Sequence, residues 1–402
     1  MKLINLGKCD KHLIYPLIGG ISNFTVSLIL IYYRDSVEIN KHPFILGINA
    51  GFGMSLAIFP YIYFFKNSKI GKRGKIINNV KNYGKLIERN NSLIKCEKYI
   101  ILFLCAFLDF LQKILVFIFH YNITNNTWVF NIIFLNVFTS MLTKNKLYKH
   151  QYLSSGIMIL CGIGLNIIFL YQMKSKDIPI LFLSMLIEII YSLAIVLAKY
   201  GMDFKFCSPF EITFYEGIFA LILNTIFLLI SSNIPLNEEF KYNDLLKISE
   251  YKGKKYLDNF YTYFEHLNYS EILLFILTMC GRLLFNLFSH ITIKHFTSSH
   301  IFLILIMGEI SSLVWSERST GEVFIIGFIF FVEFVMILVF CEIIELNFFG
   351  LEKNTRKNIE ERAKLENYED DYENDQKSDS VDIGNDLLLN FDSQSSINGN
   401  DK

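Results

Sequence analysis

Long apolar runs recur along the first 345 residues of the chain. A helix needs roughly 20 mainly apolar residues to cross a bilayer, and ten segments approach or exceed that length. They span residues 15–33, 43–65, 99–119, 128–142, 152–171, 179–198, 209–230, 270–293, 299–315 and 323–344. Short polar turns and two longer loops separate them. The pattern therefore predicts an all-α integral membrane protein with ten transmembrane helices.

The same pattern divides the chain into an N-terminal segment, a ten-helix domain and a polar C-terminal segment. These parts are residues 1–14, 15–345 and 346–402. The domain has two halves, 15–171 and 179–344, and a longer loop at 231–269 interrupts the second. The last part holds fourteen Asp and Glu against seven Lys and Arg, which predicts an acidic, partly disordered tail.

Lysine and arginine are unevenly distributed between the loops. The loop at 66–98 carries ten of them against two acids, and the loop after the fourth segment adds Lys144, Lys146 and Lys149. Positively charged loops stay cytosolic. With ten spans, both termini lie on the same side as these loops. We therefore predict cytosolic termini and a loop at 231–269 on the far side.

Composition supports a membrane protein and argues against other classes. The chain is 52% hydrophobic with a mean hydropathy of +0.36, which is too apolar for a soluble protein of this size. The formal net charge is zero, so we expect no nucleic-acid partner. The sequence contains no HExxH, GxSxG, Walker or GxGxxG motif. We therefore expect neither enzymatic activity nor a cofactor.

A charged pair interrupts the third apolar run, "FLCAFLDFLQKILVFIF" (103–119). Asp109 lies in its middle, and Lys113 follows one helical turn later. A carboxylate at the centre of a bilayer costs roughly 2.5 kcal/mol or more even on permissive scales, and such residues are functional candidates by default. Because residues i and i+4 share a helix face, Asp109 can pair with Lys113. The alternative is that Asp109 faces a cavity and binds a cation or a proton.

Polar residues fall at similar depths when helix n is compared with helix n+5. Asp109 matches Arg282, and the further pairs are Asn23 with Glu188 and Asn136 with Glu309, with Asn49 less neatly matched to Glu211 and Glu216. Many carriers consist of two inverted repeats with the substrate site between them. We therefore predict a 5+5 inverted repeat. Arg282 becomes a second candidate partner for Asp109, or a contact for a substrate carboxylate.

Three further carboxylates and one amide are candidate site residues. Glu188 is the lone charge in the core of its helix, and a desolvated carboxylate can take up a proton near neutral pH; a hydrogen-bonded structural acid is the alternative. Asn286 lies one turn after Arg282 on the same face, and Glu309 can face a cavity. Glu216 completes the set.

Three histidines recur every five residues at His290, His295 and His300. Five residues correspond to a rotation of about 140° on a helix. The three rings therefore lie on different faces, which does not suit a helical zinc site. We expect no metal site.

Three stretches carry a recognisable pattern: residues 187–227, with Glu216-Gly217 after a proline, residues 283–340 and residues 107–124. They are similar, in that order, to the sixth and seventh helices, the last three helices and the third helix of the drug/metabolite transporter superfamily, in particular the F branch of solute carrier family 35 and the chloroquine-resistance-transporter group. The resemblance covers roughly residues 15–345 and implies a ten-helix transporter of an intracellular organelle such as Golgi, vacuole or plastid.

The chain departs from the family in residues that bear on the substrate. The ninth segment lacks the Asp and Arg that are frequent in the branch, and also the Arg- or Lys-rich sites of phosphate and nucleotide-sugar carriers. The candidate charges are mainly acidic, which favours a cationic, zwitterionic or neutral solute. We therefore predict a secondary transporter of a small organic solute by alternating access, with proton coupling and a homodimer as additional hypotheses.

Two alternatives to this function stay open. The first is a nucleotide-sugar or organic-phosphate exchanger of the same fold. The second is a membrane-embedded transferase or a non-transporting scaffold that acts through its acidic tail. Partners common to the transport hypotheses are the solute, protons and membrane lipid.

Overall fold

The computed structural model describes residues 4–6, 11–32, 42–63, 84–118, 128–143, 148–172, 178–205, 207–236, 248–314 and 320–346. Helices form most of these ranges. They are α1 (Ile14–Tyr32), α2 (Pro43–Ser55), α3 (Ile58–Tyr61), α5 (Gly84–Ile118), α6 (Trp128–Thr143), α7 (Lys149–Gln172), α8 (Ile178–Phe204), α9 (Pro209–Asn233), α10 (Phe260–Glu265), α11 (Tyr269–His295), α12 (Phe302–Val314) and α13 (Thr320–Phe340). Each predicted apolar segment coincides with helix, so the all-α prediction is confirmed.

Six helical stretches in the described part of the chain are long and apolar enough to cross a membrane. They are Pro43–Tyr61, Cys96–Val116, Phe182–Phe204, Pro209–Asn233, Tyr269–His295 and Val323–Phe340. Three shorter apolar helices accompany them, at Ile14–Leu30, Phe130–Leu142 and Ser298–Gly308. The described part of α7 is not among these nine. Length and composition thus indicate a membrane-embedded helical protein.

The second predicted segment is broken rather than continuous, because of Pro60. Proline has no backbone N–H and cannot donate to the carbonyl four residues earlier, which belongs to Leu56. That carbonyl accepts from Phe59 N at 3.1 Å instead. The tighter three-residue spacing separates α2 from α3 at Leu56 and Ala57.

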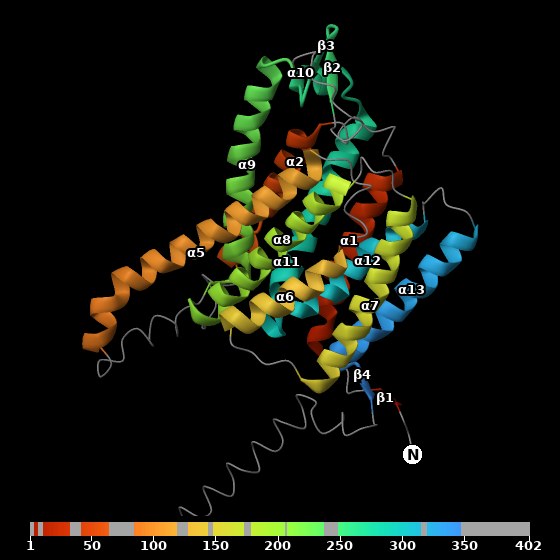
Figure 1. The fold of residues 1–402 in the computed structure, drawn as a ribbon. Coiled ribbons are helices and arrows are strands. Elements are labelled where there is room, and N and C mark those ends of the chain that lie inside the picture. The colour runs from red at the N-terminus through yellow and green to blue at the C-terminus, as the bar shows by residue number, and fades with distance from the viewer. Residues whose placement is uncertain are drawn as a thin grey trace, which may run out of the picture.

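The third segment extends further than its apolar run. α5 begins at Gly84, within the predicted loop at 66–98, and Figure 1 shows it projecting from the bundle. The added turns are rich in Lys, Glu, Arg and Leu, which have good helix propensity. Apolarity marks where a helix enters the membrane, whereas the backbone continues as helix beyond that point.

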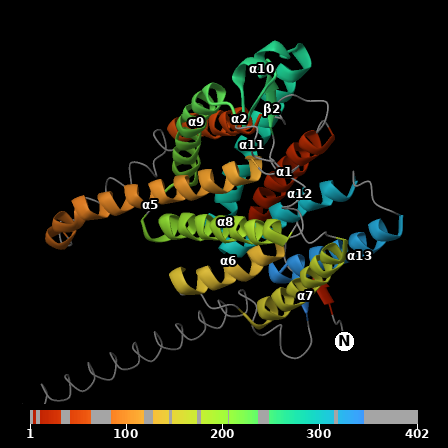
Figure 2. The ribbon, with the colours of Figure 1, turned by 45° about the horizontal axis from the view of Figure 1, so that its top comes forward.

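Contacts between helices far apart in sequence build the bundle. α1 packs on α11 and α12, and α8 packs on α5 and α6; Figure 2 shows α8 lying between α5 and α6. α2 packs on α9 and α11, α9 also packs on α5 and α11, and α7 packs on α13 and α6. Further contacts join α2 to α5, α8 to α11 and α12 to α13.

The crossing of α2 and α9 depends on two glycines. A Cβ atom on Gly51 would lie 2.7 Å from the backbone N of Leu221. A Cβ atom on Gly217 would lie 2.7 Å from the carbonyl carbon of Met54 and 2.8 Å from the carbonyl oxygen of Gly51. Small residues allow such close approach of helices in membranes. The two backbones could not pack at this distance with any larger residue.

Two short antiparallel sheets lie at opposite ends of the bundle (Figure 1). β1 (Ile4–Leu6) pairs with β4 (Ile344–Leu346) and joins the start of the chain to the segment after α13. β2 (Ser249–Tyr251) and β3 (Lys254–Tyr256) form a hairpin next to α10. Its two turn residues, Lys252 and Gly253, have φ of 51° and 75°, as a type I′ turn requires. The predicted loop at 231–269 therefore contains ordered elements.

Candidate functional site

A buried polar cluster links α5 to α11 near the middle of the bundle. Lys113 Nζ donates to Asp109 Oδ2 at 2.7 Å and to Asn286 Oδ1 at 3.1 Å. It also lies 3.2 Å from Met54 Sδ of α2. The ammonium group is therefore held by three helices. The local pairing of Asp109 with Lys113, one of the sequence hypotheses, is present.

Helical periodicity of α5 explains why this pair is buried. Asp109 and Lys113 lie on the same face as the buried Cys105, Ala106 and Phe110. The opposite face carries the exposed side chains of Phe103, Leu104 and Phe107. In a membrane, exposed apolar side chains face lipid while polar groups face the bundle interior. α5 thus presents its charges inward.

A second pair lies between α9 and α11, within electrostatic reach of the first. Glu216 Oε1 is 3.3 Å from His290 Nε2, and His290 Nδ1 is 3.0 Å from Thr213 Oγ1. Glu216 and His290 both interact electrostatically with Asp109. All of these side chains are buried. Asp109, Lys113, Asn286, Glu216 and His290 thus form a central cluster, which holds two carboxylates close to an ammonium and an imidazole.

Glu188 on α8 has polar neighbours of its own. Its carboxyl is hydrogen-bonded to the side chain of Asn131 on α6, and Ser192 Oγ donates to Asn131 Oδ1 at 2.6 Å. The neighbouring Tyr191 is within electrostatic reach of Glu188, Asp109, Glu216 and Arg282. Tyr191 thus lies within electrostatic reach of both Glu188 and the central cluster.

Arg282 on α11 is partly buried, and its carbonyl oxygen accepts from Asn286 Nδ2 at 2.8 Å. This places Arg282 one turn from the residue that contacts Lys113. The pairing of Asp109 with Arg282 stays a prediction. The side chain of Glu309 lies outside the described residues.

Asn136 is not part of this cluster. Its amide donates to Ser155 Oγ of α7 at 3.2 Å and accepts from Ser299 Oγ at 3.0 Å, where Ser299 belongs to the 3₁₀ helix η6 (Ser298–Ile301). Asn23 and Asn49 similarly bond to carbonyl oxygens of α12 and α11. Inter-helix hydrogen bonds of this kind hold membrane helices together. These three amides cross-link the bundle.

Sequence reasoning missed two members of the site, His290 and Asn131. The three histidines do occupy different surroundings: His290 contacts Glu216, His295 stacks on His12 at 4.5 Å, and His300 lies 2.8 Å from Thr297. His290 was weighed only as a metal ligand. It follows Asn286 by four residues on α11, so its position on the same buried face was the available signal.

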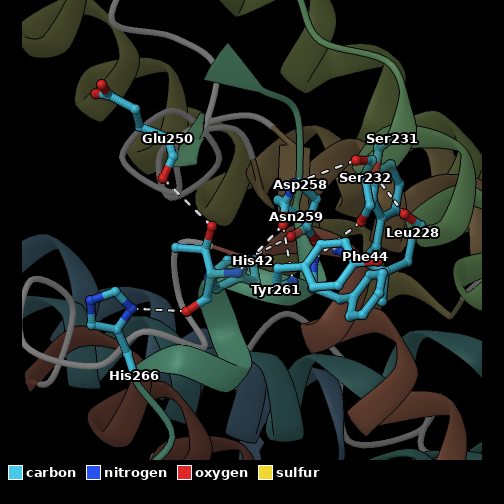
Figure 3. A network of polar contacts seen from close by, with 12 residues as sticks. His42, Phe44, Leu228, Ser231, Ser232, Glu250, Asp258, Asn259, Tyr261 and His266 are labelled. Atoms are coloured by element: carbon cyan, nitrogen blue, oxygen red, sulfur yellow. Dashed lines mark hydrogen bonds and ion pairs between the residues drawn. The ribbon is translucent and has the colours of Figure 1, made fainter. Parts of the chain in front are cut away.

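A separate buried network fixes the loop between α9 and α11 to the start of α2 (Figure 3). His42, at the N-cap of α2, makes no side-chain capping bond there. Asp258 supplies the capping bond instead, because Asp258 Oδ2 accepts from Phe44 N at 2.7 Å. Asp258 Oδ1 lies 2.6 Å from His42 Nδ1. Both side chains are fully buried. A carboxylate at a helix N-terminus is stabilised by the free N–H groups and the helix dipole.

The segment after Asp258 is held by further bonds in the same network. Asn259 caps α10 by accepting from Tyr261 N at 2.9 Å, and Ser232 Oγ at the end of α9 accepts from Phe260 N at 3.1 Å. α10 is thereby attached to both α2 and α9.

Salt bridges join α5 to the start of α9 and to the end of α8. Lys98 Nζ lies 2.8 Å from Glu211 Oε1, and Lys205 pairs with Glu97. Glu211 also accepts from Ser208 N at 3.1 Å at the N-terminus of α9. Glu211 is thus a helix-capping, ion-paired residue.

No protein-family model matches the chain, and no curated protein matches it. The site is therefore interpreted from its own geometry.

Proposed function

We propose that the chain is a secondary transporter that moves a small organic solute across a membrane by alternating access. The observation that supports this most directly is the central cluster, in which Lys113 of α5 bonds to Asn286 of α11 within an apolar bundle. Charged groups inside a membrane bundle are costly and mark solute or ion pathways.

The pattern of helix packing supports ten spans arranged as a 5+5 inverted repeat. In the order of the ten predicted segments, α1 packs on α11 and α12 as α8 packs on α5 and α6. The same rule, which exchanges each helix with the one five segments away, matches α2–α11 with α9–α5, α2–α5 with α9–α11 and α6–α7 with α12–α13. The contacts α2–α9 and α7–α13 each join two helices that the rule exchanges, so each is its own match. Of the contacts between described helices, α8–α11 lacks a matching α1–α5 contact of similar extent. Such repeats place a substrate site between the halves.

The charge balance of the cluster supports a cationic, zwitterionic or neutral solute. Asp109 and Glu216 of the cluster and the nearby Glu188 supply three carboxylates, against two cationic side chains, Arg282 and Lys113, the latter engaged by Asp109 and Asn286. Recognition of a nucleotide sugar or an organic phosphate would require converging Arg and Lys side chains. The transporter proposed here therefore exposes acidic groups to its solute.

Proton coupling is part of the proposal and is assigned to Glu188. A buried carboxyl that is hydrogen-bonded to a neutral amide can alternate between its charged and neutral forms as water enters. In proteoliposomes, Glu188→Gln should abolish the stimulation of uptake by a pH gradient while leaving exchange of solute at equal pH. Stimulation that persists in this variant would contradict the assignment.

The experiment that tests the proposed function is an uptake screen. Purified protein is reconstituted in liposomes and offered a panel of radiolabelled amines, amino acids, sugars, organic phosphates and nucleotide sugars, with and without a pH gradient. Saturable uptake of a cationic, zwitterionic or neutral compound supports the proposal. Uptake restricted to phosphates or nucleotide sugars would favour the alternative exchanger.

We also propose that both termini face the cytosol, that the protein resides in an organelle membrane, and that it forms a homodimer. The basic loops support the orientation. Labelling of a cysteine introduced at Lys254, in the β2–β3 hairpin, by an impermeant maleimide after organelle isolation tests it, since the far side is then protected. Crosslinking in the native membrane tests the dimer.

A further inference from the structure

Glu333 occupies an apolar position in the buried face of α13. Ile326, Phe330, Glu333, Ile337 and Phe340 recur at helical spacing, and each is buried. Glu333 itself has an exposed fraction of 0%. The periodicity of the helix therefore calls for an apolar side chain at this position, and a glutamate is present.

The surroundings of Glu333 are apolar. Its neighbours on the stripe belong to the same core cluster as Met158 and Leu165 of α7, and α7 packs directly on α13. Among the described residues, neither carboxyl oxygen of Glu333 has a hydrogen-bond partner. Asp109, by contrast, is bonded to Lys113.

The titratable group of α7 near Glu333 is Cys161, which interacts with it electrostatically. The described side chains of α12, which also packs on α13, are apolar from Phe302 to Met307. His150, a buried titratable group of α7, faces Glu342 at 3.2 Å, and among the described residues no cation is bonded to Glu333.

An ionised carboxylate in such a seam is strongly unfavourable, as an unpaired acid at the centre of a bilayer is. A protonated carboxyl avoids most of that cost, because it is neutral. A leucine would pack equally well without any such cost. We propose that Glu333 is a proton-binding site in the seam between α7 and α13, separate from the central cluster.

Dicyclohexylcarbodiimide is a suitable probe, since it enters apolar regions and reacts with protonated carboxyl groups. The acid proton moves to one carbodiimide nitrogen, the carboxyl oxygen bonds to the central carbon, and an acyl shift to nitrogen gives a stable N-acylurea. Nothing leaves, so the peptide gains the full mass of the reagent. The full chain is labelled in proteoliposomes over a series of pH values and analysed by peptide mass spectrometry.

We expect labelling of Glu333 that decreases as pH rises, since the protonated fraction falls about tenfold per pH unit above the ionisation point. Asp109, paired with Lys113, is the internal control and should label at least about fivefold less near neutral pH, because an ionised carboxylate does not react. Labelling of Asp109 to the same extent as Glu333 near neutral pH, or labelling of Glu333 that does not change with pH, would overturn the proposal.

A second measurement does not depend on whether the carbodiimide reaches Glu333. The unfolding temperature of the wild type should fall relative to that of Glu333→Gln as pH rises, because only the wild type must ionise a carboxyl in the seam. Parallel pH profiles of the two proteins, together with no labelling of Glu333, would overturn the proposal. The Glu188→Gln variant serves as a control for effects of the other buried acid.

Discussion

Lys113 Nζ lies 2.7 Å from Oδ2 of Asp109, one helical turn away on α5. The same ammonium donates to Asn286 of α11, so a pair formed within one helix also joins two helices. Both charged side chains are largely buried, with exposed fractions of 9% for Asp109 and 11% for Lys113. Each charge therefore depends on the other.

Removing one member of this pair should cost more than removing both. Asp109→Leu leaves a buried ammonium with no opposite charge, and we expect a loss of about 3–5 kcal/mol in the free energy of unfolding. The double variant Asp109→Leu with Lys113→Leu should regain most of it, since no unpaired charge remains. Thermal unfolding of the wild type, Asp109→Leu, Lys113→Leu and the double variant in detergent completes a double-mutant cycle.

The exposed pair of Glu97 and Lys205 provides the control for that cycle. Glu97→Gln should change stability little, because solvent screens the pair. Equal losses at the two sites, or a double variant as unstable as Asp109→Leu, would contradict the account of a buried, mutually dependent pair.

The close approach of α2 and α9 predicts a strong effect of Gly217→Ala. The added methyl group would meet backbone atoms of Met54 and Gly51, which cannot rotate away as a side chain can. We expect a loss of about 1–3 kcal/mol, the usual cost of overpacking. Gly156→Ala on α7 is the matched control, because nothing lies within 4 Å of its Cβ position. Similar unfolding temperatures for the two variants would refute the close crossing.

The network around His42 and Asp258 predicts that Asp258 holds the hairpin and α10 on α2. Asp258→Ala removes both the partner of His42 and the acceptor for Phe44 N, and we expect a local loss on the order of 3 kcal/mol. Hydrogen exchange should accelerate in β2, β3 and α10 while the central helices stay protected. Glu265→Ala, at an exposed position at the end of α10, should leave exchange unchanged. Unaltered exchange in the Asp258 variant would argue against this attachment.

Tyr263, whose ring lies edge-on to that of His42 with the centroids 5.5 Å apart, predicts a loss of stability at high pH. Burial, and then the neighbouring Glu271 carboxylate, raise the pKa of Tyr263 to about 12, whereas a free tyrosine titrates near 10. Between these values the unfolded state has lost the proton and the folded state has kept it. Stability is therefore full below about pH 10 and falls as pH rises toward about 12.

Tyr263→Phe should remove this part of the pH dependence, whereas Tyr261→Phe, at a tyrosine that is 48% exposed, should not. Unfolding temperatures measured across that pH window test the difference. A wild type and a Tyr263 variant with the same profile would show that Tyr263 ionises as an exposed residue does.

Sequence predicted the helices well where apolarity and helix coincide. It failed where they separate: the break at Pro60 depends on one lost N–H, and the start of α5 at Gly84 lies in a charged segment with good helix propensity. The hairpin at 249–256 and α10 occur in a stretch without an apolar run.

The site could be predicted only as far as local spacing reaches. The pair of Asp109 and Lys113 follows from an i, i+4 relation on one helix. The contacts of Lys113 with Asn286 and of Glu216 with His290 join helices whose crossing angles no single segment encodes. Matched depth in the two halves relates Asp109 of α5 to Arg282 of α11, whereas the bond that joins these two helices is made by Lys113 and Asn286.

The most direct test of the proposed function compares solute uptake by the wild type, Asp109→Asn and Glu97→Gln in proteoliposomes, with the compound that the screen identifies. The Asp109 variant alters the central cluster, whereas the Glu97 variant alters an exposed ion pair. The account predicts saturable uptake by the wild type and the Glu97 variant, and a loss of at least about tenfold for Asp109→Asn in folded, reconstituted protein. Absence of uptake by the wild type for every compound, or full uptake by the Asp109 variant, would contradict it.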